Sequence, residues 1–439
     1  MRYRLLATLV LSLLTSTIAT AASNDIPRPN IPDKTFTITD YGAVPDGATL
    51  NTAAIAKAID ACEKAGGGTV VVPAGKFLTA AFALADNLNL HLDQGAVLLL
   101  SNRFDDYKRA AKGGYENQIT ADGLHDIAIT GDGTIDGQGQ PWWDEFLKTK
   151  GAPADVPHMP HRPFMVVLRN CTRVLVQNVT LTRSPSFHLV PQGCRDVVID
   201  GVKFIAPAKA PNTDALDPSG WNFLITHCTF DVGDDCIAIK ATGKAPEAGH
   251  LSCEDFLVTD CTFKHGHGMS IGGQTPGGLR RLVVRNSTFE NTDAGIRLKA
   301  NRGSGGLVED CLYENLTMKT VKVPIYITSY YPENGTPKTA DADAGKPVND
   351  LTPIWRNIRI TNVTAEDSPV AGKIIGLAEM PVSDVVLTNV KISAEKPMSI
   401  WNAKGIKFVN SRVKVQKEPA LDLQNAQVSG IDPKTGEPQ

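Results

Sequence analysis

The stretch "RLVVRNSTF", residues 281–289, carries the pattern from which the fold is predicted. A short apolar strand runs into a polar residue, Asn286, and Thr288 and an apolar residue follow. Related phrases return along the chain at intervals of 21 to 47 residues, mostly in the twenties. Their polar position is held by Asn178, Gly201, His227, Asp260, Asn286, Asn315, Asn362, Asn389 and Asn410.

Short strands such as "RVLVQ" (173–177) and "FLVTD" (256–260) lie between these phrases, and helical periodicity is nearly absent after residue 160. Such a period indicates a solenoid, in which each coil buries its apolar face against its neighbours. Gly and Asn suit tight turns between strands, so the pattern favours a parallel β-helix over a leucine-rich-repeat horseshoe. A β-sandwich would show hairpin signals instead. No linker divides the chain, which predicts a single-domain, all-β protein.

The repeated Asn has two interpretations, because several copies begin an N-x-[ST] glycosylation sequon. Asn also tolerates the left-handed backbone of a coil corner, and stacked Asn side chains form an amide ladder. Since the sequons keep the register of the repeat, we interpret most of them as ladder residues. The sequons begin at Asn170, Asn178, Asn286, Asn315 and Asn362.

The ends of a solenoid expose open sheet edges that must be covered. The one clear amphipathic helix is predicted over residues 51–65, ended by three glycines, and is expected to cap the N-terminal opening. We therefore predict a cap at about 36–70 and coils at about 70–430. Segments 141–163 and 332–353 depart from the repeat and are expected to be loops beside a groove. The expected apolar side of the helix consists of Ala53, Ile55, Ile59 and Cys62.

Residues 1–22 read as a secretory signal peptide, with Arg2 and Arg4 ahead of an apolar stretch and a small-residue cleavage pattern. No later segment is apolar enough to span a bilayer. The predicted mature chain, 23–439, is therefore exported, secreted or periplasmic, and has no membrane partner. We expect it to be a monomer.

Composition and net charge also limit the classes of molecule that the chain is expected to bind. The net charge of −3 becomes about −5 once Arg2 and Arg4 are removed, which gives no support for nucleic-acid binding. If the substrate is acidic, the cations that hold it must be local. Eight cysteines without a CxxC spacing leave disulfide formation open.

Acidic turns fall into register when coils are aligned on the apolar residue that follows each turn. Asp214, Asp235 and His267 then stand two residues before that residue, in "NTDAL", "GDDCI" and "GHGM". Arg297 and Lys299 stand one and three residues after it on the next coil, "DAGI". Adjacent coils lie about 4.8 Å apart, so these side chains and Asp234 are expected to share one face.

Asp is a common turn residue, and clustered carboxylates also suit calcium. Neither interpretation explains stacked carboxylates beside an imidazole and two cations as well as catalysis does. Crowding raises the pKa of one carboxyl, which keeps a proton available for a general acid beside a base. Two carboxyl groups across a glycosidic bond suffice for hydrolysis, and an Arg-x-Lys pair suits a sugar that carries a carboxylate. The residues thus predict hydrolysis of an acidic polysaccharide, with no metal and no cofactor.

The ordered motifs "NTD", "GDD", "GHG" and "RLK" resemble the polygalacturonase family of pectin-degrading glycoside hydrolases, family 28. The likeness runs from about residue 40 to about 430, with Leu298 in place of the usual Ile. The resemblance implies a right-handed parallel β-helix and cleavage of α-1,4-galacturonosyl linkages in pectin or polygalacturonate with inversion. Carboxyls about 5 Å apart would by themselves suggest retention, so inversion rests on the resemblance alone.

The resemblance also implies roles for individual residues. Asp234 is the implied general acid, and Asp214 and Asp235 together hold and deprotonate the attacking water. His267 corresponds to a histidine beside the acid that helps to set its protonation.

Four further residues are implied to bind substrate or to shape the site. Arg297 and Lys299 correspond to the pair that binds the uronate carboxylate. Tyr331 corresponds to a tyrosine at the substrate groove, although the neighbouring Tyr330 leaves the register open. Asn212 opens the first motif and is expected to position its loop.

Two other functions remain open at this point. A pectate-lyase-like eliminase on the same scaffold would need calcium and an Arg or Lys base. A non-catalytic glycan-binding solenoid would lack activity altogether. The sequence also leaves open whether cleavage is internal or from chain ends, since that depends on whether the two loops block the groove.

Overall fold

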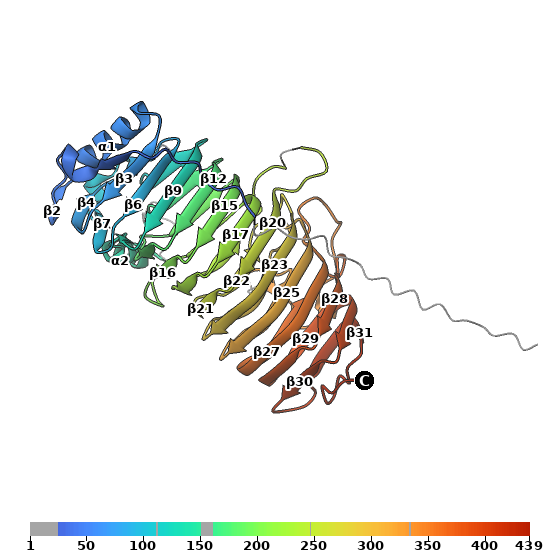
Figure 1. The fold of residues 1–439 in the computed structure, drawn as a ribbon. Coiled ribbons are helices and arrows are strands. Elements are labelled where there is room, and N and C mark those ends of the chain that lie inside the picture. The colour runs from blue at the N-terminus through green and yellow to red at the C-terminus, as the bar shows by residue number, and fades with distance from the viewer. Residues whose placement is uncertain (1–24, 111–112, 151–160, 246, 333–334) are drawn as a thin grey trace, which may run out of the picture.

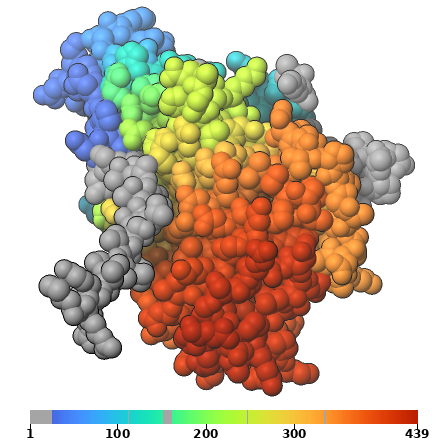
Figure 2. Space-filling model, turned by 90° about the vertical axis from the view of Figure 1, so that its right-hand side faces the viewer, coloured from blue at the N-terminus to red at the C-terminus, as the bar shows by residue number. Residues whose placement is uncertain are grey.

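The computed structural model describes residues 25–110, 113–150, 161–245, 247–332 and 335–439. The chain winds into an elongated stack of coils that runs from the blue N-terminal end to the red C-terminal end (Figure 1). Figure 2 views this stack with the red C-terminal coils in front. The predicted signal peptide, residues 1–22, lies outside the described residues.

Strands of successive coils pair in parallel and form three ladders along the stack. The first ladder contains β1 (Thr35–Thr37), β3 (Gly68–Val72), β6 (Leu88–Leu92), β9 (His125–Gly131), β12 (Thr172–Gln177), β15 (Cys194–Asp200), β17 (Gly220–Thr226), β20 (Cys253–Thr259) and β28 (Val382–Thr388). The second contains β2 (Asp46–Leu50), β4 (Gly75–Thr79), β7 (Ala96–Leu100), β10 (Thr134–Asp136), β13 (Thr180–Thr182), β16 (Lys203–Ile205), β18 (Thr229–Asp231), β21 (Thr262–His265) and β30 (Arg412–Val415).

The third ladder lies on the remaining side of each coil. It contains β5 (Phe82–Ala83), β8 (Ile119–Asp122), β11 (Val166–Arg169), β14 (Leu189–Gln192), β19 (Ile237–Ile239), β22 (Met269–Gly272), β24 (Ala294–Lys299) and β26 (Val323–Thr328). Five longer strands turn corners and take part in more than one ladder: β23 (Leu279–Glu290), β25 (Leu307–Lys319), β27 (Ile354–Ile375), β29 (Lys391–Val409) and β31 (Leu421–Ser429). The predicted parallel β-helix is therefore confirmed.

The predicted Asn corner is also confirmed. Asn286, Asn315 and Asn362 have φ values of 50°, 54° and 53°, in the left-handed region that Asn tolerates. From Asn315 onward, each corner Asn donates its side-chain amide to the Asn of the preceding corner: Asn315 to Asn286 at 3.1 Å, Asn362 to Asn315 at 3.0 Å, Asn389 to Asn362 at 3.0 Å and Asn410 to Asn389 at 2.8 Å. The repeated Asn thus satisfies its own polar group while it turns the chain.

Inside the coils, equivalent apolar residues stack on one another. Phe204, Phe230, Phe263 and Phe289 are buried, and their successive ring centroids lie 5.2, 4.9 and 4.2 Å apart. No single coil has a hydrophobic interior of its own, so the core forms only when the coils stack.

Helix α1 (Thr52–Lys64) packs against β1 and β3 at the N-terminal end of the stack, as predicted for a cap. Its buried residues are Ile55, Ala58, Ile59 and Cys62. The prediction was wrong for Ala53, which is exposed. The reason is the helical period: positions 55, 58, 59 and 62 lie on one face, and position 53 does not. A 3₁₀ turn, η1 (Ile38–Tyr41), also contacts this helix.

The segment 141–163 was predicted to be a loop, and this prediction was wrong for its first part. Helix α2 (Gln140–Thr149) occupies its first part, with Trp142 and Trp143 buried. Trp142 packs on Tyr107 and Tyr115, and the 3₁₀ turn η2 (Phe104–Asp106) lies against it. Burial of two indoles stabilises this helix although it falls outside the repeat. Residues 151–160 are outside the described part of the chain.

The tract 335–353 contains the short 3₁₀ turn η4 (Ala340–Ala342) and no strand, in agreement with the predicted loop. All eight cysteines are buried, unpaired thiols. No helix in the described residues is long and apolar enough to cross a membrane.

Candidate active site

The third ladder brings the acidic turns together in the predicted register. Leu216 bridges to Ile237, Ile237 pairs with Met269, and Met269 pairs with Ile296. These are the four apolar residues on which the turns were aligned. The residues that precede and follow them therefore lie side by side on successive coils, and we call Asp214, Asp234, Asp235 and His267 the acid cluster.

Asp235 is the most heavily bonded carboxylate of the cluster. It is buried, and it accepts hydrogen bonds from Arg297 Nη1 at 2.8 Å, Lys299 Nζ at 2.6 Å and Ser270 Oγ at 3.0 Å. Burial alone would raise the pKa of this carboxyl, but the charges of Lys299, His267 and Arg297 hold it well below its usual range. Asp235 is thus an anion near neutral pH.

His267 joins the two carboxylates of the "GDD" motif. Its Nδ1 lies 3.0 Å from Asp234 Oδ1 and 3.5 Å from Asp235 Oδ1, and its Nε2 lies 3.2 Å from Asp293 Oδ2. Burial opposes the charged imidazole, but the hydrogen bonds to Asp234 and Asp235 raise the pKa of His267 to about 9. The ring therefore retains a proton beside Asp234 at neutral pH. Asp293, which sequence analysis missed, is paired in turn with Lys322 at 2.5 Å.

Asp234 is the carboxyl of the cluster that solvent reaches, with 24% of its side chain exposed against 4% for Asp235. Asn212 Nδ2 lies 3.5 Å from Asp234 Oδ2, so the "NTD" and "GDD" motifs are in contact. Arg162 donates to Asn212 Oδ1 at 2.7 Å and thereby turns the amide nitrogen toward Asp234. Sequence analysis missed Arg162, because it lies outside the repeat and no register relates it to Asn212.

Asp214 is buried, and the carboxyl of Asp217, which is also buried, acts on it. Lys240 Nζ lies 3.4 Å from Asp214 Oδ2 and makes a closer ion pair with Asp217. Burial and the charge of Asp217 raise the pKa of Asp214, and Lys240 acts against that shift. The pKa values of Asp214 and Asp235 are thus shifted in opposite directions, because Asp214 is buried beside Asp217 whereas Asp235 is bonded by cations. The raised pKa belongs to Asp214 and not to the carboxyl implied to be the acid.

Sequence analysis did not assign roles to Asp217 and Lys240, although a signal for them was present. Lys240 follows Ile237 by three residues, as Lys299 follows Ile296, so the two lysines share one position of the ladder two coils apart. Asp217 occupies the position of Arg297 in the same way. Only the described contacts show that these residues pair with each other.

The structure distinguishes Tyr331 from its neighbour Tyr330 by their contacts. The Tyr331 ring lies 4.9 Å from Lys299 Nζ and 5.7 Å from Arg297 Cζ, whereas Tyr330 hydrogen bonds through its hydroxyl to Asp343. Tyr331 is therefore the tyrosine beside the predicted cation pair. It also lines a pocket of about 460 Å³, which consists of Asn301, Arg302, Ser329, Tyr330, Tyr331, Pro332, Gly335 and Lys346.

Asp234, Asp235 and His267 each offer an atom to a group whose members lie within 4.8 Å of one another, the spacing of a metal site. Both oxygens of Asp235 already accept from cationic side chains. A divalent ion there would have to share its ligand with Arg297 and Lys299. The donor set therefore favours proton chemistry over cation binding.

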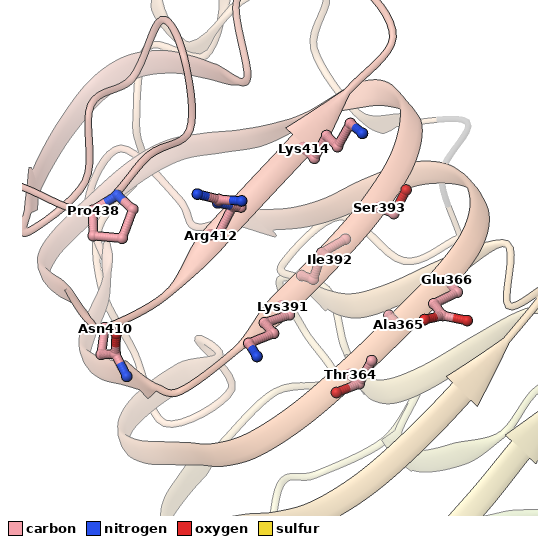
Figure 3. A pocket seen from close by; sticks show the side chains of 10 residues that line it. All are labelled: Thr364, Ala365, Glu366, Lys391, Ile392, Ser393, Asn410, Arg412, Lys414 and Pro438. Carbon is pink, nitrogen blue, oxygen red and sulfur yellow. The ribbon is translucent and has the colours of Figure 1, made fainter.

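A second pocket, of about 470 Å³, lies on the C-terminal coils (Figure 3). Side chains from β27, β29 and β30 line it, and Lys391 and Arg412 are paired neighbours on successive coils. Arg412 is already paired with Glu437 at 2.5 Å. None of the predicted site residues lines this pocket.

Comparison with known proteins identifies the family to which this chain is similar. A family model, "Glycosyl hydrolases family 28", matches residues 62–413. The chain is 30% identical over 398 residues to a probable polygalacturonase of Vitis vinifera, across 86% of this chain and 78% of that protein. It is 29% identical over 384 residues to an endo-polygalacturonase of Pectobacterium carotovorum subsp. carotovorum, across 81% of this chain and 86% of that one.

A solved structure agrees with these matches. The hyperthermoactive exopolygalacturonase from Thermotoga maritima superposes with a TM-score of 0.75 at 25% identity, over 94% of this chain and 97% of that one. The predicted right-handed parallel β-helix is therefore confirmed, and so is the predicted enzyme class, a glycoside hydrolase. With the four motifs on one ladder and the family match over most of its length, this chain belongs to family 28 of the glycoside hydrolases.

Proposed function

We propose that the protein hydrolyses α-1,4-galacturonosyl linkages in pectin or polygalacturonate, with inversion at the anomeric carbon. The observation that carries the proposal is the pairing of a solvent-accessible Asp234 with a protonated His267, directly beside the cation-bound anion Asp235. The polygalacturonase relatives support the substrate. Inversion is what the motif resemblance implies. The predicted export accords with a plant cell-wall polysaccharide as the partner.

Asp234 acts as the general acid in this proposal. It protonates the glycosidic oxygen as the C1–O bond breaks, and it is left as a carboxylate. The contact with the protonated His267 at 3.0 Å supports the role, because it stabilises the carboxylate that forms when Asp234 gives up its proton. Asn212, itself oriented by Arg162, positions the second oxygen of Asp234.

Asp214 and Asp235 hold and deprotonate the attacking water. The water oxygen bonds to C1 on the face opposite the leaving group, and its proton passes to the carboxylate pair. Burial of both carboxylates supports the role, since a base shielded from solvent interacts strongly with a bound water.

Arg297, Lys299 and Tyr331 form the binding side of the proposed site. Arg297 is the more accessible cation, with 13% of its side chain exposed against 3% for Lys299. We therefore assign the direct contact with the uronate carboxylate to Arg297, while Lys299 holds Asp235 from below. Tyr331, beside both cations, offers a ring on which a sugar can pack.

Digestion of de-esterified polygalacturonate by the purified protein tests the proposed function. We expect new reducing ends without the ultraviolet absorbance of an unsaturated uronate. Absorbing products would indicate the eliminase alternative, and the absence of any product would indicate a non-catalytic solenoid. Product sizes over time distinguish internal cutting, which gives a ladder, from end-wise attack, which gives monomer alone.

Replacing Arg297 with Ala is expected to raise KM about 10- to 100-fold more for de-esterified polygalacturonate than for its methyl-esterified form. The reason is that a hydrogen bond to a charged group contributes about 1.5–3 kcal/mol. Because Arg297 also bonds Asp235, kcat should fall on both substrates, and only the difference in KM reports the carboxylate. Arg359→Ala, in an exposed ion pair, is the control. An equal change of KM on both substrates would contradict the assignment.

A further inference from the structure

A buried lysine lies beneath the proposed water base. Lys240 Nζ is 3.4 Å from Asp214 Oδ2, makes its closest contact with Asp217 Oδ2, and lies 4.0 Å from the centroid of the Phe187 ring. The ion pair and the aromatic ring hold the ammonium group in one place. Lys240 follows β19, and Asp214 and Asp217 flank Leu216, so the contact joins two adjacent coils.

The carboxylate of Asp214 is poorly supported compared with that of Asp235. Its side chain is 5% exposed, and Lys240 is the only described side chain that donates a hydrogen bond to it. Its Oδ1 is buried and accepts no hydrogen bond from any described residue. Asp235, by contrast, accepts from Arg297, Lys299 and Ser270.

The charges around Asp214 are mostly unfavourable to an anion. Asp217, Asp234 and Asp235 are the carboxyl groups that act on it, and Arg162 and Lys240 are the cations. Arg162 donates its hydrogen bonds to Asn212 and to two backbone carbonyls instead of to Asp214. Lys240 is therefore the one cation among the described residues that contacts this carboxylate.

We propose that Lys240, anchored by Asp217 and Phe187, is a positioning residue that favours the ionised form of Asp214 and orients its Oδ2. This inference rests on the proposed function, because it presupposes Asp214 as part of the base. The proposal adds a chain of two ion pairs across adjacent coils, in which Asp217 holds Lys240 in place and Lys240 holds Asp214 in place.

Asp217 and Lys240 should then act on Asp214 in opposite directions. Removing Lys240 leaves Asp214 among carboxylates, so it takes up a proton at higher pH. Removing the charge of Asp217 ends one repulsion and leaves the charge of Lys240 undivided, so Asp214 takes up a proton at lower pH. A charged neighbour within about 4–6 Å shifts a carboxyl pKa by about 1–3 units.

The test is the pH dependence of kcat/KM on polygalacturonate for Lys240→Met, Lys240→Arg and Asp217→Asn. The acid limb, which reports the base of the free enzyme, is expected to move up by about one pH unit or more in Lys240→Met. It should move down in Asp217→Asn and lie near the wild-type position in Lys240→Arg. Lys391→Met, at the remote pocket of Figure 3, is the matched control and should leave the profile unchanged.

An acid limb that stays in place in Lys240→Met and Asp217→Asn, whatever the loss of rate, would overturn the inference and leave Lys240 with a structural role only. If Lys240→Met does not fold, the downward shift in Asp217→Asn and the retained limb in Lys240→Arg decide the matter. Failure of the proposed function looks different, because the wild-type protein itself would then release no reducing ends.

Discussion

Asp235→Asn is expected to abolish hydrolysis and to lower the free energy of unfolding by about 3–5 kcal/mol. Asp235 is the shared anion of Arg297 and Lys299, and Lys299 is only 3% exposed at its side chain. An amide of the same shape leaves the lysine as an uncompensated buried charge, which is the expensive outcome of breaking a buried ion pair. Denaturant unfolding followed by circular dichroism measures the loss.

A matched control and a second substitution separate stability from catalysis. Asp384→Asn breaks an exposed pair with Arg359 and should change stability by no more than about 1 kcal/mol. Adding Lys299→Met to Asp235→Asn removes the orphaned cation, so stability should return in part while activity remains absent. An unfolding free energy for Asp235→Asn within about 1 kcal/mol of the wild type would show that the ion pairs do not hold this coil.

Asp234→Asn is expected to lower kcat on polygalacturonate by about 10²–10⁴-fold, the range that general acid catalysis supplies. Its partly exposed side chain bears no buried ion pair like that of Asp235, so the fold should be little affected. The amide cannot give a proton to the glycosidic oxygen. Initial rates of reducing-end formation, with circular dichroism as a check of folding, measure the effect.

The chain offers a close control for Asp234. Asp231, on β18 of the same coil, pairs with His265 at 2.7 Å but lies outside the acid cluster, so Asp231→Asn should retain activity. A substrate with an acidic leaving group needs less protonation, so the defect of Asp234→Asn should shrink on an aryl galacturonide. A defect of equal size on both substrates would argue against the general-acid role.

The fold was predictable because its information is local and repeated. Asn315 and Asn362 stand at corners where the chain requires a left-handed backbone. The side-chain amide of Asn362 also donates a hydrogen bond to the side-chain oxygen of Asn315. The same repetition predicted the register of the third ladder, since Ile237, Met269 and Ile296 must stack for any coil to bury its core. The meeting of Asp214, Asp235 and His267 follows from that register.

Elements outside the repeat were harder to predict. Helix α2 depends on a pocket that receives Trp142 from distant aromatic residues, and its segment resembles a loop when taken alone. The exposure of Ala53 depends on which face of α1 meets the stack. Arg162 lies outside the repeat and donates a hydrogen bond to Asn212. The spacing of residues in the sequence therefore gave no indication of this contact.

By itself, the sequence determined the coil, its corners and the meeting of Asp214, Asp235 and His267 on neighbouring coils, because stacking makes equal positions neighbours. Only the tertiary structure decided how their charges pair: Lys299 and Arg297 bind Asp235, Lys240 binds Asp217 and Asp214, and His267 shares its proton with Asp234. The physical reason is that register fixes where a backbone lies to within a coil spacing of about 4.8 Å. Ion pairing depends on where side-chain atoms lie to within about 1 Å, and on how much water each one has lost.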